Sequence, residues 1–259
     1  AEYLVVWMHD VSGNSSQFEI WGKIIAWNGS YQKAPFQIAA WPNRTMWTPR
    51  VVWNHNRNEY LVVWNAFDTA TGLPTDISSA LIRRDGHIID GSNLTTSTFP
   101  HQVDLAYGWA TDEYLVAFVR SYSLGATAND IYGRKVGKNG NTIGGSFPII
   151  NWPQDETRPD VAASFNATPE YVAIWQRATG SGHELAARRW GGGLPPRPFD
   201  VLGGEFWESV NPAVATNPPH YFFAWEGDST SNPTVVRHIY GRQWAPNAVM
   251  VPLVVRNKR

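Results

Sequence analysis

The chain of 259 residues contains no cysteine and few charged residues. Without cysteine it has no disulfide bond, no thiolate zinc site and no cysteine nucleophile, but this absence does not indicate a compartment. Charged residues make up 17% of the chain, and 21 basic against 22 acidic side chains leave a net charge of -1. Nucleic-acid binding needs clustered Lys and Arg. We therefore expect no nucleic-acid partner.

Several other signals are missing. No run reaches the ~20 apolar residues that span a bilayer, and no segment shows a sustained helical period. The chain has no Gly-x-Ser-x-Gly elbow, no Gly-rich phosphate loop and no pair of histidines at metal spacing. We expect no membrane span, no cofactor and no metal site built from side chains. A calcium ion held by backbone carbonyls would leave no trace in the sequence.

One short phrase is repeated along the chain. It is complete at Glu2–Trp7 and Glu59–Trp64, where both copies read Glu-Tyr-Leu-Val-Val-Trp. Altered copies follow at 113–118, 170–175 and 220–225. The copies thus begin about 50 to 57 residues apart, a period that indicates a β-propeller or another array of β units.

The residues around each copy fall into register as well. A strand that opens with Pro precedes four copies, at Pro49, Pro100, Pro159 and Pro212. A third strand opens with an acid and an aliphatic residue, and Asn-Gly or Asp-Gly pairs then predict a tight hairpin into a short fourth strand. The repeated acids are Glu19, Asp76, Asp130 and Glu184.

Four short antiparallel strands, repeated radially, make the blade of a propeller. We therefore predict an all-β fold, a five-bladed β-propeller of four-stranded antiparallel blades, in a single domain over 1–259 with repeats starting near 2, 49, 100, 159 and 212. The first unit lacks a first strand of its own. Either residues after Leu253 supply it, or the chain is a fragment of a longer one, a six-bladed parent included.

These units resemble repeats of large secreted or surface proteins of bacteria, which read roughly Pro-x-Val-Ala, Glu-Tyr-Leu-Val-Val-Trp and Asp-Ile-Tyr-Gly. The resemblance covers Glu2 to about Leu253, and it is weakest in the last unit, where His220 and His238 replace acids. It implies a propeller and a secreted or cell-surface location. It implies no known activity, so it assigns no catalytic residue.

Two repeated features have structural interpretations. An aromatic residue ends the phrase in every unit, and we expect it to wedge between neighbouring sheets. The acid that opens each third strand is expected to bind backbone N–H groups at the turn. The aromatic residues are Trp7, Trp64, Phe118, Trp175 and Trp225.

The loops that leave the second and fourth strands emerge at the same end of a propeller. Aromatic rings beside planar hydrogen-bonding groups suit a sugar, which offers an apolar face and a rim of hydroxyls. We therefore predict a carbohydrate-binding site here, with packing between blades as the alternative role for the tryptophans. The predicted ligand-binding residues are Trp41, Trp47, Trp152, Trp207, Asp10, Asn65, Arg120, Arg177 and Glu226.

These observations favour a non-catalytic, lectin-like module that binds carbohydrate or polysaccharide. One alternative is a glycoside hydrolase, which needs two carboxylates across one bond and would draw them from Asp10, Asp68, Asp160 and Glu226. The first strands themselves carry few acids, Asp104 and Asp160. A further alternative is a structural scaffold for protein partners.

Overall fold

The computed structural model describes residues 2–31, 33–95, 100–121, 128–165, 170–180, 182–191, 194–199, 208–217, 220–228, 238–244 and 251–254. The ordered elements of these residues are β-strands, numbered β1 to β19. Within these ranges no helix is long and apolar enough to cross a membrane. The fold is therefore all-β, as the sequence predicts.

The strands form five antiparallel sheets, numbered here in chain order. Sheet 1 contains β1 (Glu2–Asp10), β2 (Phe18–Ala26) and β3 (Phe36–Ala39). Sheet 2 contains β4 (Arg44–Asn54), β5 (Glu59–Asp68), β6 (Pro74–Arg83) and β7 (Ile88–Thr95). Sheet 3 contains β8 (Pro100–Gly108), β9 (Glu113–Ser121), β10 (Asn129–Gly137) and β11 (Thr142–Pro148). Sheet 4 contains β12 (Glu156–Ala163), β13 (Glu170–Ala178), β14 (His183–Gly191) and β15 (Leu194–Phe199). Sheet 5 contains β16 (Glu208–Asn217), β17 (His220–Asp228), β18 (His238–Trp244) and β19 (Val251–Val254).

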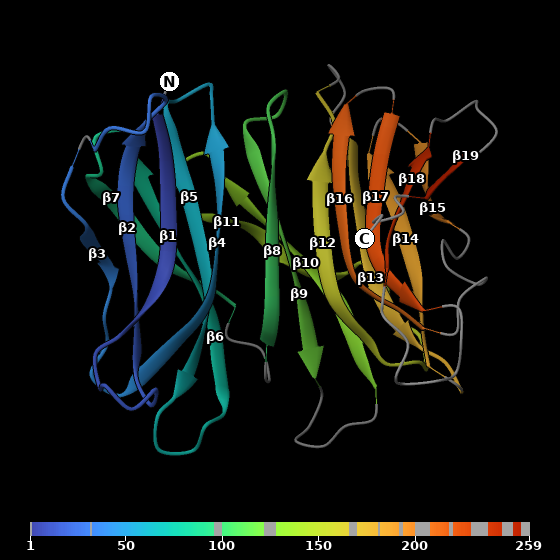
Figure 1. Ribbon diagram of the computed structural model, residues 1–259, viewed down its shortest axis with the longest axis horizontal. Helices are drawn as coiled ribbons and strands as arrows, with labels where there is room; N and C mark the ends of the chain where they lie inside the picture. Colours follow the sequence, from blue (N-terminus) through green and yellow to red (C-terminus); the bar gives the residue numbers. More distant parts are fainter. Residues whose placement is uncertain are drawn as a thin grey trace.

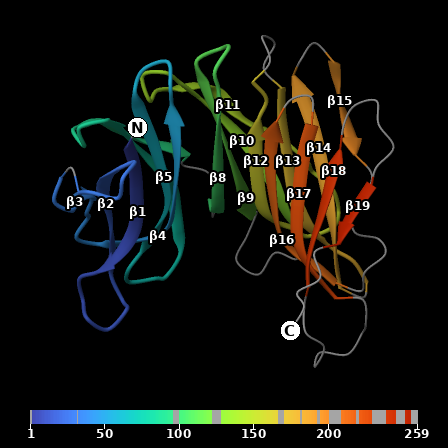
Figure 2. The same cartoon turned by 45° about the horizontal axis from the view of Figure 1, so that its top comes forward.

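Each sheet is built from strands that follow one another in sequence. The repeated phrase forms β1, β5, β9, β13 and β17, and in sheets 2 to 5 this strand has a neighbour on both sides. Its continuous apolar run fits a strand that is covered on both faces. The sheets succeed one another through the molecule, from β1 to β19 (Figures 1 and 2).

The first strands of sheets 2 to 5, called the inner strands, contact one another in order. The contacts run from β4 to β8, from β8 to β12 and from β12 to β16. Within the described residues, no contact of comparable extent joins sheet 5 to sheet 1. Among the described residues, the contacts between sheets therefore run in series from sheet 1 to sheet 5.

Apolar clusters fill the space between consecutive sheets. They join sheet 1 to sheet 2, sheet 2 to sheet 3, sheet 3 to sheet 4 and sheet 4 to sheet 5. The repeated aromatics Trp64, Phe118, Trp175 and Trp225 are buried in these clusters. Their expected role as wedges between sheets is confirmed at these positions.

Glycine in the third strands has a steric reason. A Cβ on Gly22 would lie 2.8 Å from the side chain of Ile38, and one on Gly133 would lie 2.7 Å from the ring of Phe147. Both contacts are closer than carbon atoms approach, so glycine at these positions leaves room for a fourth-strand side chain. The predicted hairpin glycines behave differently, since Gly86 and Gly140 have positive φ.

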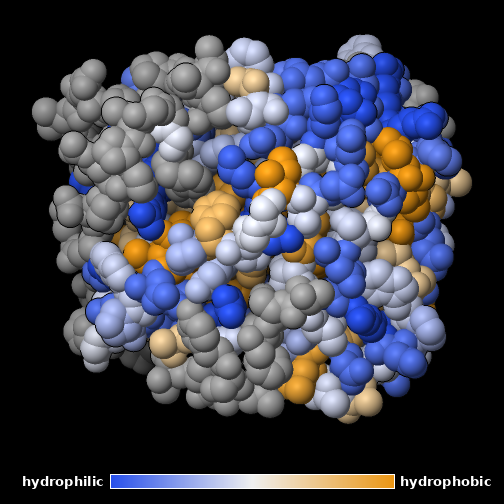
Figure 3. Space-filling view, turned by 180° about the vertical axis from the view of Figure 1, so that it is seen from behind, coloured by the Kyte–Doolittle hydropathy of each residue, from blue (hydrophilic) through white to orange (hydrophobic). Residues whose placement is uncertain are grey.

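Seen from behind, the coloured residues are mostly hydrophilic, and the hydrophobic ones among them form separate patches (Figure 3). The first sheet has three strands, because β1 pairs only with β2 among the described residues. Residues 255–259, a predicted source of its fourth strand, lie outside the described part of the chain.

Candidate active site

Each inner strand is interrupted at the same place. The register slips between Trp47 and Arg50, and equivalent slips occur in β8, β12 and β16. At each slip a non-glycine residue adopts a left-handed backbone, with φ between 49° and 54°. Such conformations are costly, and they cluster at functional sites. These four residues, called the bulge row, are Thr48, Gln102, Arg158 and Asn211.

Side chains link the bulge row from strand to strand. The backbone N–H of Arg158 donates to Oε1 of Gln102 at 2.7 Å. The Arg158 guanidinium donates to Oδ1 of Asn211, whose Nδ2 donates to Oε1 of Glu226 at 2.9 Å. The row therefore forms a polar chain across sheets 3, 4 and 5, and Arg158 and Asn211 are exposed to solvent.

A second row lies just beyond each bulge. Arg50, Asp104, Asp160 and Ala213 pair with equivalent residues of the second strands, so they occupy one repeat position. Oδ2 of Asp104 accepts the backbone N–H of Val161 at 2.8 Å, and Oδ1 of Asp160 accepts that of Val214 at 2.8 Å. Each acid thus bridges to the next inner strand.

Burial sets the protonation of these two acids. Desolvation and the nearby charge of Asp160 raise the pKa of Asp104 to about 7, although Arg50 lies within reach, with Nε 3.5 Å from Oδ1 of Asp104. Desolvation also raises the pKa of Asp160 to about 6. Two interacting carboxyl groups with pKa values near neutrality can hold and exchange a proton at ordinary pH.

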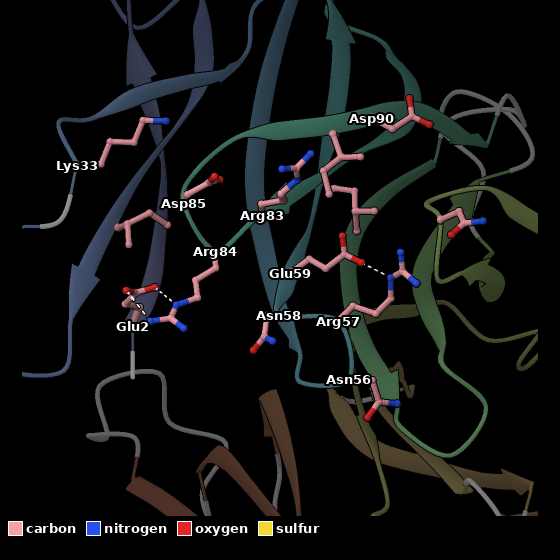
Figure 4. A pocket seen from close by; sticks show the side chains of 14 residues that line it. Glu2, Lys33, Asn56, Arg57, Asn58, Glu59, Arg83, Arg84, Asp85 and Asp90 are labelled. Carbon is pink, nitrogen blue, oxygen red and sulfur yellow. Dashed lines mark hydrogen bonds and ion pairs between the residues drawn. The ribbon is translucent and has the colours of Figure 1, made fainter.

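A groove of about 1110 Å³ lies at the other end of the strands. It is lined by the turns between first and second strands and between third and fourth strands, including Asn58 and Asp85 (Figure 4). Two ion pairs lie within it, since Arg84 pairs with Glu2 and Arg57 with buried Glu59. We place the candidate site at the inner strands, because the groove contains no comparably perturbed carboxyl pair.

Trp41 and Trp47 lie near the junction of sheets 1 and 2. Trp41 packs against the cluster between these sheets, with its ring 6.2 Å from that of Trp64. Trp47 is 44% exposed and contacts the rings of Phe18 and Phe67. Packing therefore accounts for Trp41, whereas Trp47 presents a face to solvent.

The predicted residues of sheets 3 and 4 form separate contacts. Arg177 stacks on Trp152, which is 39% exposed, and Arg177 also bonds to Glu184. Arg120 lies over the ring of Tyr132. Trp207 lies outside the described residues.

The remaining predicted residues differ in their surroundings. Asp10 binds the backbone N–H groups of its own loop at Ser12, Gly13 and Ser15. Asn65 is buried and donates to Thr48 of the bulge row. Glu226 accepts from Asn211 of the same row. The structure thus brings Asn65 and Glu226 to the candidate site, and the ligand role of the full set stays a prediction.

The acids that open the third strands bind side chains, whereas we expected backbone N–H groups. Glu19 accepts from Trp21 and Gln37, Asp76 from Arg44 and Ser78, and Glu184 from Arg177.

Within the described residues, no group of three or more His, Asp or Glu side chains is placed to hold a metal ion.

The fourth acid, Asp130, faces another carboxyl group. Glu156 is fully buried, and neither of its oxygens has a hydrogen-bond partner among the described residues. Desolvation and the charge of Asp130 raise the pKa of Glu156 to about 8. This pair was not predicted from the sequence.

The bulge row was also missed, although the sequence offered a signal for it. A residue of the row immediately precedes Pro49, Pro159 and Pro212, the prolines that mark the first strands. A left-handed backbone there follows from the slip between neighbouring strands, which no single strand sequence specifies.

No protein-family model matches the sequence, and no curated protein matches it either. Solved structures do share the fold. A protein of unknown function from Dyadobacter fermentans aligns with a TM-score of 0.70 at 8% identity, over 98% of this chain and 79% of its own. The α-L-arabinofuranosidase Arb93A from Fusarium graminearum aligns with a TM-score of 0.59 at 12% identity, over 95% and 72%. A GH43 β-1,3-galactosidase aligns with a TM-score of 0.56 at 10% identity, over 100% and 91%.

These matches correct the main functional expectation. Two of these neighbours have names of glycosidases, an arabinofuranosidase and a galactosidase. The prediction of a non-catalytic, lectin-like module was therefore wrong, because it treated near-equivalent repeats as a sign that no catalytic set exists. The symmetry is in fact broken at the inner strands, where Asp104 and Asp160 stand in place of Arg50 and Ala213.

Proposed function

We propose that this protein is a glycoside hydrolase. In this proposal the five sheets act as the blades of a five-bladed β-propeller, and their inner strands surround the reaction site. The observation that carries it is the carboxyl pair of Asp104 and Asp160 on adjacent inner strands. The shared fold of an arabinofuranosidase and a galactosidase supports it, and a carbohydrate is the expected substrate.

The pair suits the acid and base steps of glycoside hydrolysis. One carboxylic acid must protonate the leaving oxygen, while a carboxylate activates water or attacks the sugar. Asp104 has the higher pKa and retains its proton further into the neutral range, so we assign it as the general acid. Asp160 has the lower pKa, so we assign it as the base or nucleophile. Both pKa values describe the coupled pair.

The surrounding residues would position the substrate. Arg158 and Asn211 are exposed beside the acids and carry hydrogen-bonding groups on a backbone fixed by the bulge. Fixed donors cost little reorganisation when charge develops at the reacting sugar. Trp47 is exposed in sheet 2 and offers a ring for stacking on a sugar face.

The proposal is tested by sugar release from aryl α-L-arabinofuranosides, aryl β-D-galactosides, arabinan and galactan. Replacing either acid by its amide, Asp104→Asn or Asp160→Asn, should lower kcat by about 100-fold or more, because each removes an acid or base role. Asp85→Asn, in a turn of the groove at the other end, is the matched control and should retain full activity.

Circular dichroism and thermal melting establish that each variant is folded. If both folded variants hydrolyse the substrates at the wild-type rate, the carboxyl pair has no part in the mechanism. Absence of turnover on every substrate by the folded wild-type protein would refute the proposed function for these substrate classes.

A further inference from the structure

Three consecutive inner strands are followed by an aromatic ring, at the end of the strands opposite to the carboxyl pair. The residues are His55, Trp109 and Phe165, called the ring row. Each lies five residues after the second-row residue of its own strand, so the three occupy one repeat position. Five residues of extended chain span on the order of 15 Å. The ring row is therefore separate from the candidate reaction site.

The three rings contact one another across sheets 2, 3 and 4. The ring of His55 lies 6.4 Å from that of Trp109 and 6.5 Å from that of Phe165, with an interplanar angle of 39° in both pairs. Trp109 packs against the apolar cluster between sheets 2 and 3, which anchors the row. His55 is exposed and Phe165 is 59% exposed. Contacts within the row thus leave ring surface open to solvent.

The ring row continues into the groove described above. Asn56, next to His55, lines the groove and donates from Nδ2 to the backbone oxygen of Trp109 at 2.9 Å. From there the groove extends over the turns of sheet 2 to Lys33 of sheet 1 and Asn139 of sheet 3 (Figure 4). Its volume of about 1110 Å³ exceeds the about 300–1,000 Å³ of a small-molecule site even without the ring row. The combined surface suits a chain of several units.

The lining of the groove indicates the chemistry of that chain. Four cationic and four anionic side chains line it, and this balance favours a neutral ligand. Among the described residues, no hydrogen bond or ion pair engages the side chains of Asn58, Arg83 and Asn139. Their planar amide and guanidinium groups can bind hydroxyls. A protein interface needs an apolar core with few charges, whereas only three of the 14 lining residues are apolar, Ile24, Leu81 and Ile89.

We propose that the ring row and the groove bind a neutral polysaccharide chain without cleaving it. The rings of His55 and Phe165 would stack on the apolar faces of sugars, and Asn58 and Arg83 would bind hydroxyls. Asp85 is not part of this set, because its carboxylate accepts the backbone N–H of His87 in its own turn. The choice of a sugar polymer over other neutral chains rests on the proposed function. Holding one part of a polymer raises the effective concentration of the rest at the reaction site.

The test measures polysaccharide binding in a background that does not depend on turnover. The Asp160→Asn protein is run in native gels that contain arabinan or galactan, and the retardation at increasing polymer concentration gives a Kd. Phe165→Ala and Arg83→Ala, each added to this background, should raise the Kd about fivefold or more, because a stacking ring or a hydroxyl-binding group is lost. Both side chains are exposed, so the fold should survive, and thermal melting checks this.

Trp27→Ala is the matched control. Trp27 is 72% exposed in the turn between β2 and β3, and it lies outside both the ring row and the groove lining. This variant should keep the Kd of the background. An unchanged Kd in both Phe165→Ala and Arg83→Ala would overturn the proposed site, as would equal weakening by Trp27→Ala. Absence of retardation by either polymer would overturn the proposal outright.

A kinetic comparison separates this site from the reaction site. In the catalytically competent protein, Phe165→Ala should raise the ratio of KM for the polymer to KM for an aryl glycoside about fivefold, because one sugar unit cannot reach both sites. Equal changes in the two KM values would place Phe165 in the reaction site and overturn the remote role. Retardation without any hydrolysis would refute the proposed function and leave the binding site standing, so the two failures are distinguishable.

Discussion

Glu156 shows how much the surroundings of one side chain determine its chemistry. The equivalent positions in the other sheets hold Met46, Pro100 and Ser209, which carry no charge. A carboxyl group placed among such neighbours loses its hydration, and Asp130 adds a like charge. When Glu156 retains its proton, its carboxyl group is neutral and places no second negative charge beside Asp130.

This position predicts a specific dependence of stability on pH. The pKa of Glu156 is raised in the folded state to about 8, so its protonated form stabilises the fold fully below about pH 4.5. That contribution is lost as the pH rises through about 8. Glu156→Gln keeps the neutral form, and we expect the free energy of unfolding of the variant to exceed that of wild type by on the order of 3 kcal/mol at pH 8.

Urea unfolding at pH 4.5 and pH 8 measures this difference. Asp85→Asn, in an exposed turn, is the control for general effects of removing a carboxylate. A gap between Glu156→Gln and wild type that does not widen with pH would show that Glu156 titrates normally.

At the scale of strands, identical sequence produces different burial. Val5 and Val62 occupy the same place in two copies of the same phrase, yet Val5 is 44% exposed and Val62 is fully buried. Sheet 1 covers the face that contains Val62, while the described residues leave the matching face of sheet 1 open. The energetic role of each strand therefore depends on its neighbours.

These two valines provide a matched test. Val62→Ala should lower the free energy of unfolding by about 1.5–3 kcal/mol, because two buried methyl groups are removed. Val5→Ala should cost less than about 1 kcal/mol. Equal costs, measured by urea unfolding, would show that the outer face of sheet 1 is covered in solution.

The strands were largely predictable from the sequence, whereas the register shifts between paired strands were not. The phrase placed β1, β5, β9, β13 and β17, because its run of five apolar residues is a strong local signal. The Asp-Gly and Asn-Gly pairs placed the hairpins at Gly86 and Gly140. The bulges arise from pairing between strands, so their left-handed residues and the site they form could not be derived from one strand at a time.

At the scale of the whole molecule, equivalent repeats carry unequal chemistry. The inner strands share one geometry, and only two of the four described carry an acid in the second row. The sequence identified Asp104 and Asp160 as first-strand acids. It could not show that they lie on neighbouring strands with coupled protonation, because that depends on how sheets 3, 4 and 5 pack.

The most direct test of the account is the pH dependence of kcat/KM on a substrate that the protein hydrolyses. A base and an acid in one pair should produce a narrow bell, with activity rising through an apparent pKa near about 6 as Asp160 ionises and falling near about 7 as Asp104 does. The falling limb should disappear in any residual activity of Asp104→Asn. A profile that is flat across this range, or a bell that both amide variants retain, would contradict the assignment of the site to these two acids.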